Sequence, residues 1–193
     1  MLTHLAAILM LAQAAAAPAA SAPPPPSMPP SMPKGEALEA QIAANDARLF
    51  WGFFEGCDPD AVAPLIHPDF RMLHDLAGEA LASGAQMLDQ SRAECARRAP
   101  GGENAGYRNR RLHVPGSRRV QALGEWGALE EGRHGFYEWR KSLNEGRGGW
   151  ELTGGARYIH VWQWMPDERG FRLLESLSVD HGAALPYPPA AEE

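Results

Sequence analysis

The chain has 193 residues and a net charge of −6 at pH 7, and its first charged side chain is Lys34. A mildly acidic surface with charges of both signs argues against nucleic acid and anionic membranes as partners. From Lys34 onward about 160 residues remain, which is enough for one compact domain with a core of its own.

The N-terminal region resembles an export signal followed by a linker. Residues 1–17 are short, apolar and rich in Ala and Leu, and they end in an Ala-x-Ala type cleavage site. Residues 18–33 are rich in Pro, Ala and Ser and predict an extended linker. We therefore expect a periplasmic or secreted protein with no membrane span after signal removal, one domain over residues 34–183, and a flexible tail over residues 184–193.

The two cysteines, Cys57 and Cys95, predict one disulfide bond, because an exported chain with an even number of cysteines usually pairs them. Two separate buried thiols, or a reactive cysteine, are the alternatives. No Cys-x-x-Cys or His/Cys spacing indicates zinc, so we predict no metal and no cofactor.

The first half of the domain reads as helices with one hairpin between them. Apolar residues at helical spacing predict a helix over Gly35–Gly56. Asp58 and Pro59 begin a short second helix through Ile66, and Ser83 caps a third that runs to about Arg98. Between these, Asp69–Asp75 alternates as a strand with Phe70, Met72 and His74 on one face, and Glu79–Ala82 returns as a second strand.

The second half reads as an antiparallel sheet. Strands are predicted over Tyr107–Leu123, with a kink at Pro115-Gly116, and over Ala128–Arg140. A glycine-rich loop over Ser142–Gly154 then leads into a long hairpin over Gly155–His181, whose turn contains Pro166 and Gly170.

The hairpin has one face that suits the wall of a pocket. Alternation places large rings and one imidazole together on its first strand: Ala156, Tyr158, His160, Trp162 and Trp164. On the return strand, alternation groups Phe171, Leu173, Glu175, Leu177 and Val179 against Arg172, Leu174, Ser176, Ser178 and Asp180. A face with rings, an imidazole and little charge is typical of an apolar pocket, although a plain core face with one hydrogen-bonded histidine fits it equally.

This order of elements, α+β with helices first, resembles the nuclear transport factor 2-like superfamily, and within it the SnoaL-like and domain-of-unknown-function 4440 branch. The resemblance covers about residues 36–181 and rests on FFEGCD, LIHPDFRMLHD, GALEEGRHGFYE, HVW and LSVDH. It implies a cone-shaped, strongly curved antiparallel sheet wrapped around N-terminal helices, as in nuclear transport factor 2-like and cystatin-like folds. It also implies an enclosed pocket and a homodimer through the outer sheet face.

The resemblance also suggests site residues. His74 falls where the steroid isomerases of the superfamily keep their proton-abstracting carboxylate, whereas Phe50 stands where they have a tyrosine. A neutral imidazole could accept a proton from a carbon acid near neutral pH. The predicted ligand-binding residues are Phe70, Met72, His74, His134, Phe136, Tyr158, His160 and Trp162.

Three functions remain open from the sequence. The first is an exported protein that binds a small apolar or aromatic molecule in its pocket. The second is an acid–base lyase or isomerase with His74 as its base. The third is a structural or dimerisation module without a ligand, in which side chains fill the pocket. The sequence leaves open whether any reaction is catalysed.

Overall fold

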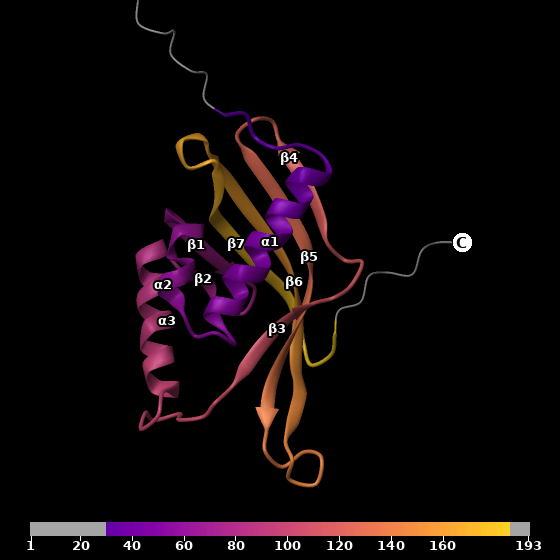
Figure 1. Ribbon diagram of the computed structural model, residues 1–193. Helices are drawn as coiled ribbons and strands as arrows, with labels where there is room; N and C mark the ends of the chain where they lie inside the picture. Colours follow the sequence, from indigo (N-terminus) through magenta and orange to yellow (C-terminus); the bar gives the residue numbers. More distant parts are fainter. Residues whose placement is uncertain (1–29, 186–193) are drawn as a thin grey trace, which may run out of the picture.

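The structure is a computed structural model that describes residues 30–185, in which helices pack against the hollow face of a curved sheet (Figure 1). The predicted signal peptide, linker residues 18–29 and tail residues 186–193 lie outside the described residues and stay predictions. The helices are α1 (Glu36–Phe53), α2 (Pro59–Val62), the 3-10 helix η1 (Ala63–Leu65), α3 (Gly84–Arg98) and the 3-10 helix η2 (Pro166–Glu168). The strands are β1 (Ile66–His74), β2 (Gly78–Leu81), β3 (Asn109–His113), β4 (Arg119–Leu123), β5 (Gly127–Arg140), β6 (Gly149–Met165) and β7 (Gly170–Gly182).

The helix starts follow the predicted caps. The Asp58 carboxylate accepts a hydrogen bond from the backbone N–H of Ala61, and the Ser83 hydroxyl accepts one from Gln86, each at 3.1 Å. Each bond satisfies one of the backbone donors that a helix N-terminus leaves free. The second predicted helix is shorter than expected, because η1 and then β1 replace its last turns.

The sheet has the strand order β2-β1-β7-β6-β5-β3, with β4 also paired to β5. The prediction of a wholly antiparallel sheet is wrong at one place, because β1 and β7 run parallel, with Arg71 opposite Glu175. A parallel pair needs a long connection, and the chain between these two strands supplies one. Alternation within a strand says nothing about the direction of a partner so far along the chain.

Two strand boundaries also differ from the prediction. The stretch Tyr107–Leu123 forms two strands, β3 and β4, which pair with successive parts of β5 on either side of the Pro115-Gly116 turn. The predicted loop Ser142–Gly154 is partly strand, since β6 begins at Gly149. Trp139 and Trp150 are register partners there, with ring centroids 5.5 Å apart, and this aromatic pair stabilises the end of the β5–β6 hairpin. The hairpin extends beyond the helices (Figure 1).

A β-bulge in β7 reverses its faces halfway along. Val161 pairs with Glu175 but Trp162 pairs with Leu173, so Leu174 is an extra residue in β7. Phe171 and Leu173 are buried before the bulge, as predicted, but after it the buried residues are Ser176 and Ser178. The predicted grouping of Glu175, Leu177 and Val179 with Phe171 is therefore wrong, and two hydroxyl groups face the hollow side.

The predicted disulfide bond between Cys57 and Cys95 is present, with the two Cα atoms 5.5 Å apart. It joins the segment that follows α1, which contains Cys57, to α3, which contains Cys95. Among the described residues, no helix is both long and apolar enough to cross a lipid bilayer.

Candidate functional site

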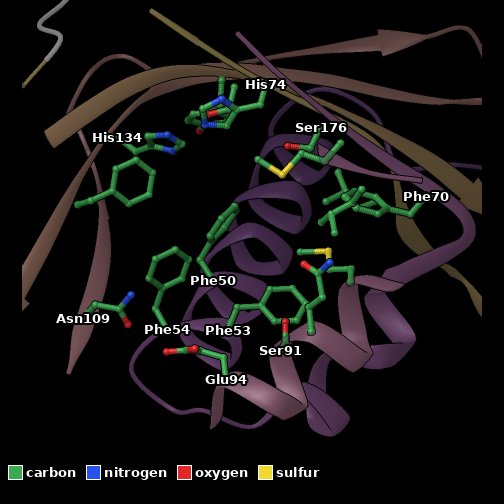
Figure 2. Close-up of a pocket in the computed structure, with 18 of the residues that line it drawn as sticks. Phe50, Phe53, Phe54, Phe70, His74, Ser91, Glu94, Asn109, His134 and Ser176 are labelled. Carbon is green, nitrogen blue, oxygen red and sulfur yellow. The ribbon is translucent and has the colours of Figure 1, made fainter. Parts of the chain in front are cut away.

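A cavity of about 550 Å³ lies between α1, α3 and the hollow face of the sheet. Its volume is within the range of small-molecule sites. Figure 2 shows Phe50 and Phe53 of α1 and the adjoining Phe54 around its centre, His74 and His134 at one end, and Ser91 and Glu94 of α3 at the other. The site is thus a cavity with phenylalanine rings around its centre, imidazoles at one end and polar side chains of α3 at the other.

All but one of the predicted ligand-binding residues line this cavity. They are Phe70, Met72, His74, His134, Phe136, Tyr158 and His160. Trp162 does not line it: the side chain is fully buried, and its indole Nε1 donates to Glu130 Oε2 at 2.9 Å. The α1 phenylalanines were not predicted as lining residues, although they lie on the apolar stripe that predicted the helix.

Behind the imidazole end lies a buried ionic network that the sequence pattern did not predict. Asp46 of α1 accepts hydrogen bonds on Oδ2 from Arg111 Nη1 and Arg118 Nη2, each at 2.7 Å. Asp46 is 1% exposed and Glu130 is fully buried. In the sequence, the one indication of this network is Asp46, a charged residue on the apolar stripe of α1. It lies four residues after Ile42 and four before Phe50.

Glu130 of β5 is the second anion of this network. Its carboxylate accepts from the Arg118 Nε at 2.8 Å, from the Tyr158 hydroxyl at 3.0 Å and from the Trp162 indole at 2.9 Å. All three groups donate to Glu130, so its carboxyl group acts as the acceptor in each of these bonds. The network therefore balances two carboxylates against two guanidinium groups.

His160 sits between the two carboxylates. Its Nδ1 lies 3.5 Å from Asp46 Oδ1 and 3.6 Å from Glu130 Oε2. Burial lowers the pKa of this imidazole, but Asp46 and Glu130 outweigh burial and hold the pKa above its ordinary value. For the Asp46 carboxyl the effect of burial has the opposite sign and raises the pKa. Arg111 and His160 outweigh burial and hold the pKa of Asp46 well below its usual range.

His134 is held as a neutral donor. Its Nδ1 accepts a hydrogen bond from Arg111 Nε at 2.7 Å. A guanidinium group can only donate, so the single proton of the neutral ring is on Nε2. Burial, followed by the charge of Arg111, lowers the pKa of His134 to about 2. The Nε2 atom is buried and has no hydrogen-bond partner within residues 30–185, although the ring lines the cavity.

The low pKa of His134 predicts a dependence of stability on pH. The unfolded chain takes up a proton at this ring near its ordinary pKa of 6.5, and the folded chain does so only near 2. Stability should therefore fall below pH 6.5, by about 1.4 kcal/mol per pH unit for this group. Urea denaturation from pH 7 to pH 4.5 measures it, with a shallower slope expected for His134→Gln.

The other histidines with shifted pKa values do not change the expected difference in slope between the wild type and His134→Gln. His113, whose pKa burial lowers, contributes equally to both proteins. His160, with its raised pKa, loses its stabilising contribution only as the pH rises above 6.5. Identical slopes for wild type and His134→Gln would contradict the account of His134.

A second polar cluster lies at the rim of the cavity. His181 Nδ1 is 2.6 Å from Asp75 Oδ1, and its Nε2 is 3.2 Å from the Ser178 hydroxyl. The His74 ring stacks on His181 with centroids 4.0 Å apart. His74 Nδ1 accepts the backbone N–H of Leu76 at 3.2 Å, so neutral His74 presents a donor rather than a base at Nε2.

Within the part of the chain that the structure describes, two groups of side chains have ligand atoms close enough for a metal ion. They are His74 with Asp75 and His181, and Asp46 with Glu130 and His160. In the buried group, Arg111 and Arg118 already balance the carboxylates. In the rim group, hydrogen bonds engage His74 Nδ1 and His181 Nδ1. Both clusters are thus explained by bonds within the protein.

Comparison with known proteins identifies the fold. No model of a known protein family matches the sequence, and no curated protein matches it. Solved structures do match. Aln2 from a Streptomyces species has a TM-score of 0.56 at 12% identity, covering 76% of this chain and 92% of Aln2. A Nuclear transport factor 2 (NTF2-like) superfamily protein from Salmonella enterica has a TM-score of 0.53 at 15% identity, covering 81% of this chain and 97% of that protein.

A third match is a Catenulispora acidiphila protein in complex with S-DNPA, with a TM-score of 0.55 at 12% identity. It covers 75% of this chain and 95% of that protein. The chain is therefore an α+β protein with the nuclear transport factor 2-like fold, as its sequence motifs predicted. Assignment to the SnoaL-like branch stays a prediction.

Proposed function

We propose that the protein binds a small, largely aromatic molecule that carries one hydrogen-bond acceptor, such as a carbonyl oxygen. The observation that carries this proposal is the unpartnered Nε2–H of His134, a side chain only 3% exposed, in a cavity that phenylalanine rings also line. A buried donor without a partner costs about 1–3 kcal/mol. A ligand acceptor would remove this penalty.

The surroundings of His134 favour a flat ring. The ring centroid of His134 is 4.6 Å from that of Phe136 and 5.0 Å from that of Tyr158, and the Phe50 ring stacks on His160 at 5.6 Å. Aromatic walls of this kind bind planar apolar groups through burial and offset stacking. The Catenulispora acidiphila protein with the same fold was solved in complex with S-DNPA, which supports a binding role.

The two alternative functions have less support. If side chains filled the pocket, as a purely structural module requires, no cavity of about 550 Å³ would remain. An isomerase with His74 as its base needs a free lone pair on that ring. The only basic nitrogen of neutral His74, Nδ1, accepts the Leu76 backbone N–H.

A pair of matched probes tests the binding proposal. 2-Acetylnaphthalene carries a carbonyl, and 2-ethylnaphthalene has the same ring without the acceptor. By isothermal titration calorimetry the ketone should bind about 2- to 10-fold more tightly, which is the value of one hydrogen bond. His134→Phe should abolish this difference, whereas His134→Gln, which keeps an N–H donor, should retain part of it.

His67→Gln is the control, since His67 does not line the cavity. It should leave both affinities unchanged. Equal affinities for the two probes in the wild type, or no binding of either, would contradict the proposal.

Export and self-association belong to the same proposal. We expect the mature chain to begin after Ala17 and to carry the Cys57–Cys95 bond, which is compatible with an oxidising compartment. Homodimerisation through the outer sheet face stays a prediction. The intact mass of the exported protein and light scattering on it would test both.

A further inference from the structure

The rim cluster places a serine, a histidine and an aspartate in series. The Ser178 hydroxyl lies 3.2 Å from His181 Nε2, and His181 Nδ1 lies 2.6 Å from Asp75 Oδ1. A second bond fixes the carboxylate, because its Oδ2 accepts the backbone N–H of His181 at 3.2 Å. Ser178 and His181 both line the cavity, and Ser178 is 4% exposed.

Local backbone features bring these side chains together. The bulge at Leu174 turns Ser178 toward the hollow face. Residues three apart on a regular strand face opposite sides, but Asp180 has a φ of 58°, in the left-handed region. This turn at Asp180 brings His181 back to the side of Ser178, while the Asp180 carboxylate bonds Arg157 on the outside at 2.9 Å.

The parallel pairing of β1 with β7 supplies the aspartate. His74 is the register partner of Ser178, and the backbone N–H of Asp75 donates to the Ser178 carbonyl at 3.1 Å. The end of β1 therefore delivers Asp75 next to the end of β7. His74 stacks on His181 and covers one face of its ring.

The hydrogen bonds define what each group can do. An ionised Asp75 accepts a hydrogen bond from the Nδ1–H of His181, which leaves the lone pair of Nε2 directed at the Ser178 hydroxyl. Burial raises the pKa of Asp75, but the bonds from His181 outweigh it and lower the pKa, so the carboxylate stays ionised at neutral pH. This is the arrangement in which a histidine activates a serine.

We propose that Ser178, His181 and Asp75 form a nucleophilic triad that hydrolyses an ester of a small aromatic molecule held in the pocket. The proposal rests on the binding function proposed above. Ser178 and His181 are its catalytic residues, and Asp75 is a positioning residue. The serine lies on a strand outside any Gly-x-Ser-x-Gly motif, so sequence inspection does not reveal it.

The reaction has two steps. The Ser178 oxygen attacks the ester carbonyl carbon while His181 Nε2 takes the hydroxyl proton. The bond from this carbon to the leaving oxygen then breaks, and His181 gives its proton to the departing alcohol. Water, activated by the same His181, attacks the acyl-serine, which releases the acid and restores the hydroxyl. His134 lines the same cavity, and its unpartnered Nε2–H would serve as the donor for the developing oxyanion.

The experiment uses 2-naphthyl acetate, the ester counterpart of the ketone probe, and a fluorophosphonate that labels activated serines. The wild-type protein should release 2-naphthol and gain one phosphonyl group, which peptide mapping should place on Ser178. Ser178→Ala should abolish the label and lower kcat/KM by a factor on the order of 10³.

Two variants separate catalysis from structure. Ser142→Ala removes an exposed hydroxyl that lies outside both the cavity and the triad, so labelling and turnover should persist. Asp75→Asn should slow labelling and lower kcat while the affinity for 2-acetylnaphthalene stays unchanged. A role of Asp75 in folding alone would move both readouts together.

The outcomes distinguish this inference from the binding proposal. Binding of the ketone without turnover or labelling would overturn the triad and leave the binding function standing. A label on any residue other than Ser178, or equal loss in Ser142→Ala and Ser178→Ala, would also overturn the triad. Failure to bind the ketone together with failure to hydrolyse the ester would overturn both proposals.

Discussion

Replacing Asp46 by Asn is expected to lower the free energy of unfolding by about 3–5 kcal/mol. The Asp46 carboxylate bonds both Arg111 and Arg118, and Arg111 is itself packed over the Phe50 ring, 3.7 Å from its centroid. Without this anion, two guanidinium groups face one remaining carboxylate, that of Glu130. Removing one partner of a buried ionic network leaves the others desolvated and uncompensated.

Urea denaturation of the wild type and of Asp46→Asn at pH 7 measures this loss. Asp60→Asn is the matched control, since Asp60 also bonds an arginine, Arg92 at 2.7 Å, but with its side chain 73% exposed. An exposed pair of this kind contributes about 0–1 kcal/mol. Equal losses of unfolding free energy in the two variants would contradict a stabilising role of the buried network.

Loss of the Cys57–Cys95 bond should lower stability by about 4 kcal/mol. The bond closes a loop with a sequence separation of 38 residues, and it therefore restricts the unfolded chain more than the folded one. It also ties α3 to the end of α1, the two helices that wall the aromatic cavity. The double variant Cys57→Ser/Cys95→Ser should consequently lose affinity for 2-acetylnaphthalene as well as stability.

Denaturation of the double variant beside wild type, with and without reductant, provides the measurement. Reductant should lower the stability of wild type to that of the variant and leave the variant unchanged. Two free thiols in the native wild-type protein, detected by intact mass after alkylation, would contradict this expectation.

Local patterns in the sequence predicted those parts of the fold that depend on near neighbours. Ser83 and Asp58 cap helices because each cap bonds a residue three positions on. Alternation placed Tyr158 and His160 on the buried face of β6, where they line the cavity. The cysteine pair followed from compartment and count.

The polar parts of the site depend on contacts between distant segments, which periodicity does not contain. Asp46 meets Arg111 across 65 residues, and His181 meets Asp75 across 106. Ser178 faces the cavity only because of a bulge within β7, and alternation assigned it to the other face. Asp180 and His181 are neighbours in the chain, but Asp180 bonds Arg157 while His181 bonds Asp75.

We expect His134 to offer a neutral Nε2–H to a ligand in the cavity. Proton–nitrogen correlation spectra of the imidazole rings test it most directly, by following His134 between pH 4.5 and pH 8 with and without 2-acetylnaphthalene. The structure predicts a proton on Nε2 throughout this range and a shift of that signal when the ketone is added, but not when 2-ethylnaphthalene is added. A ring protonated on Nδ1, a titration near the ordinary pKa of histidine, or identical responses to the two probes would contradict the claim.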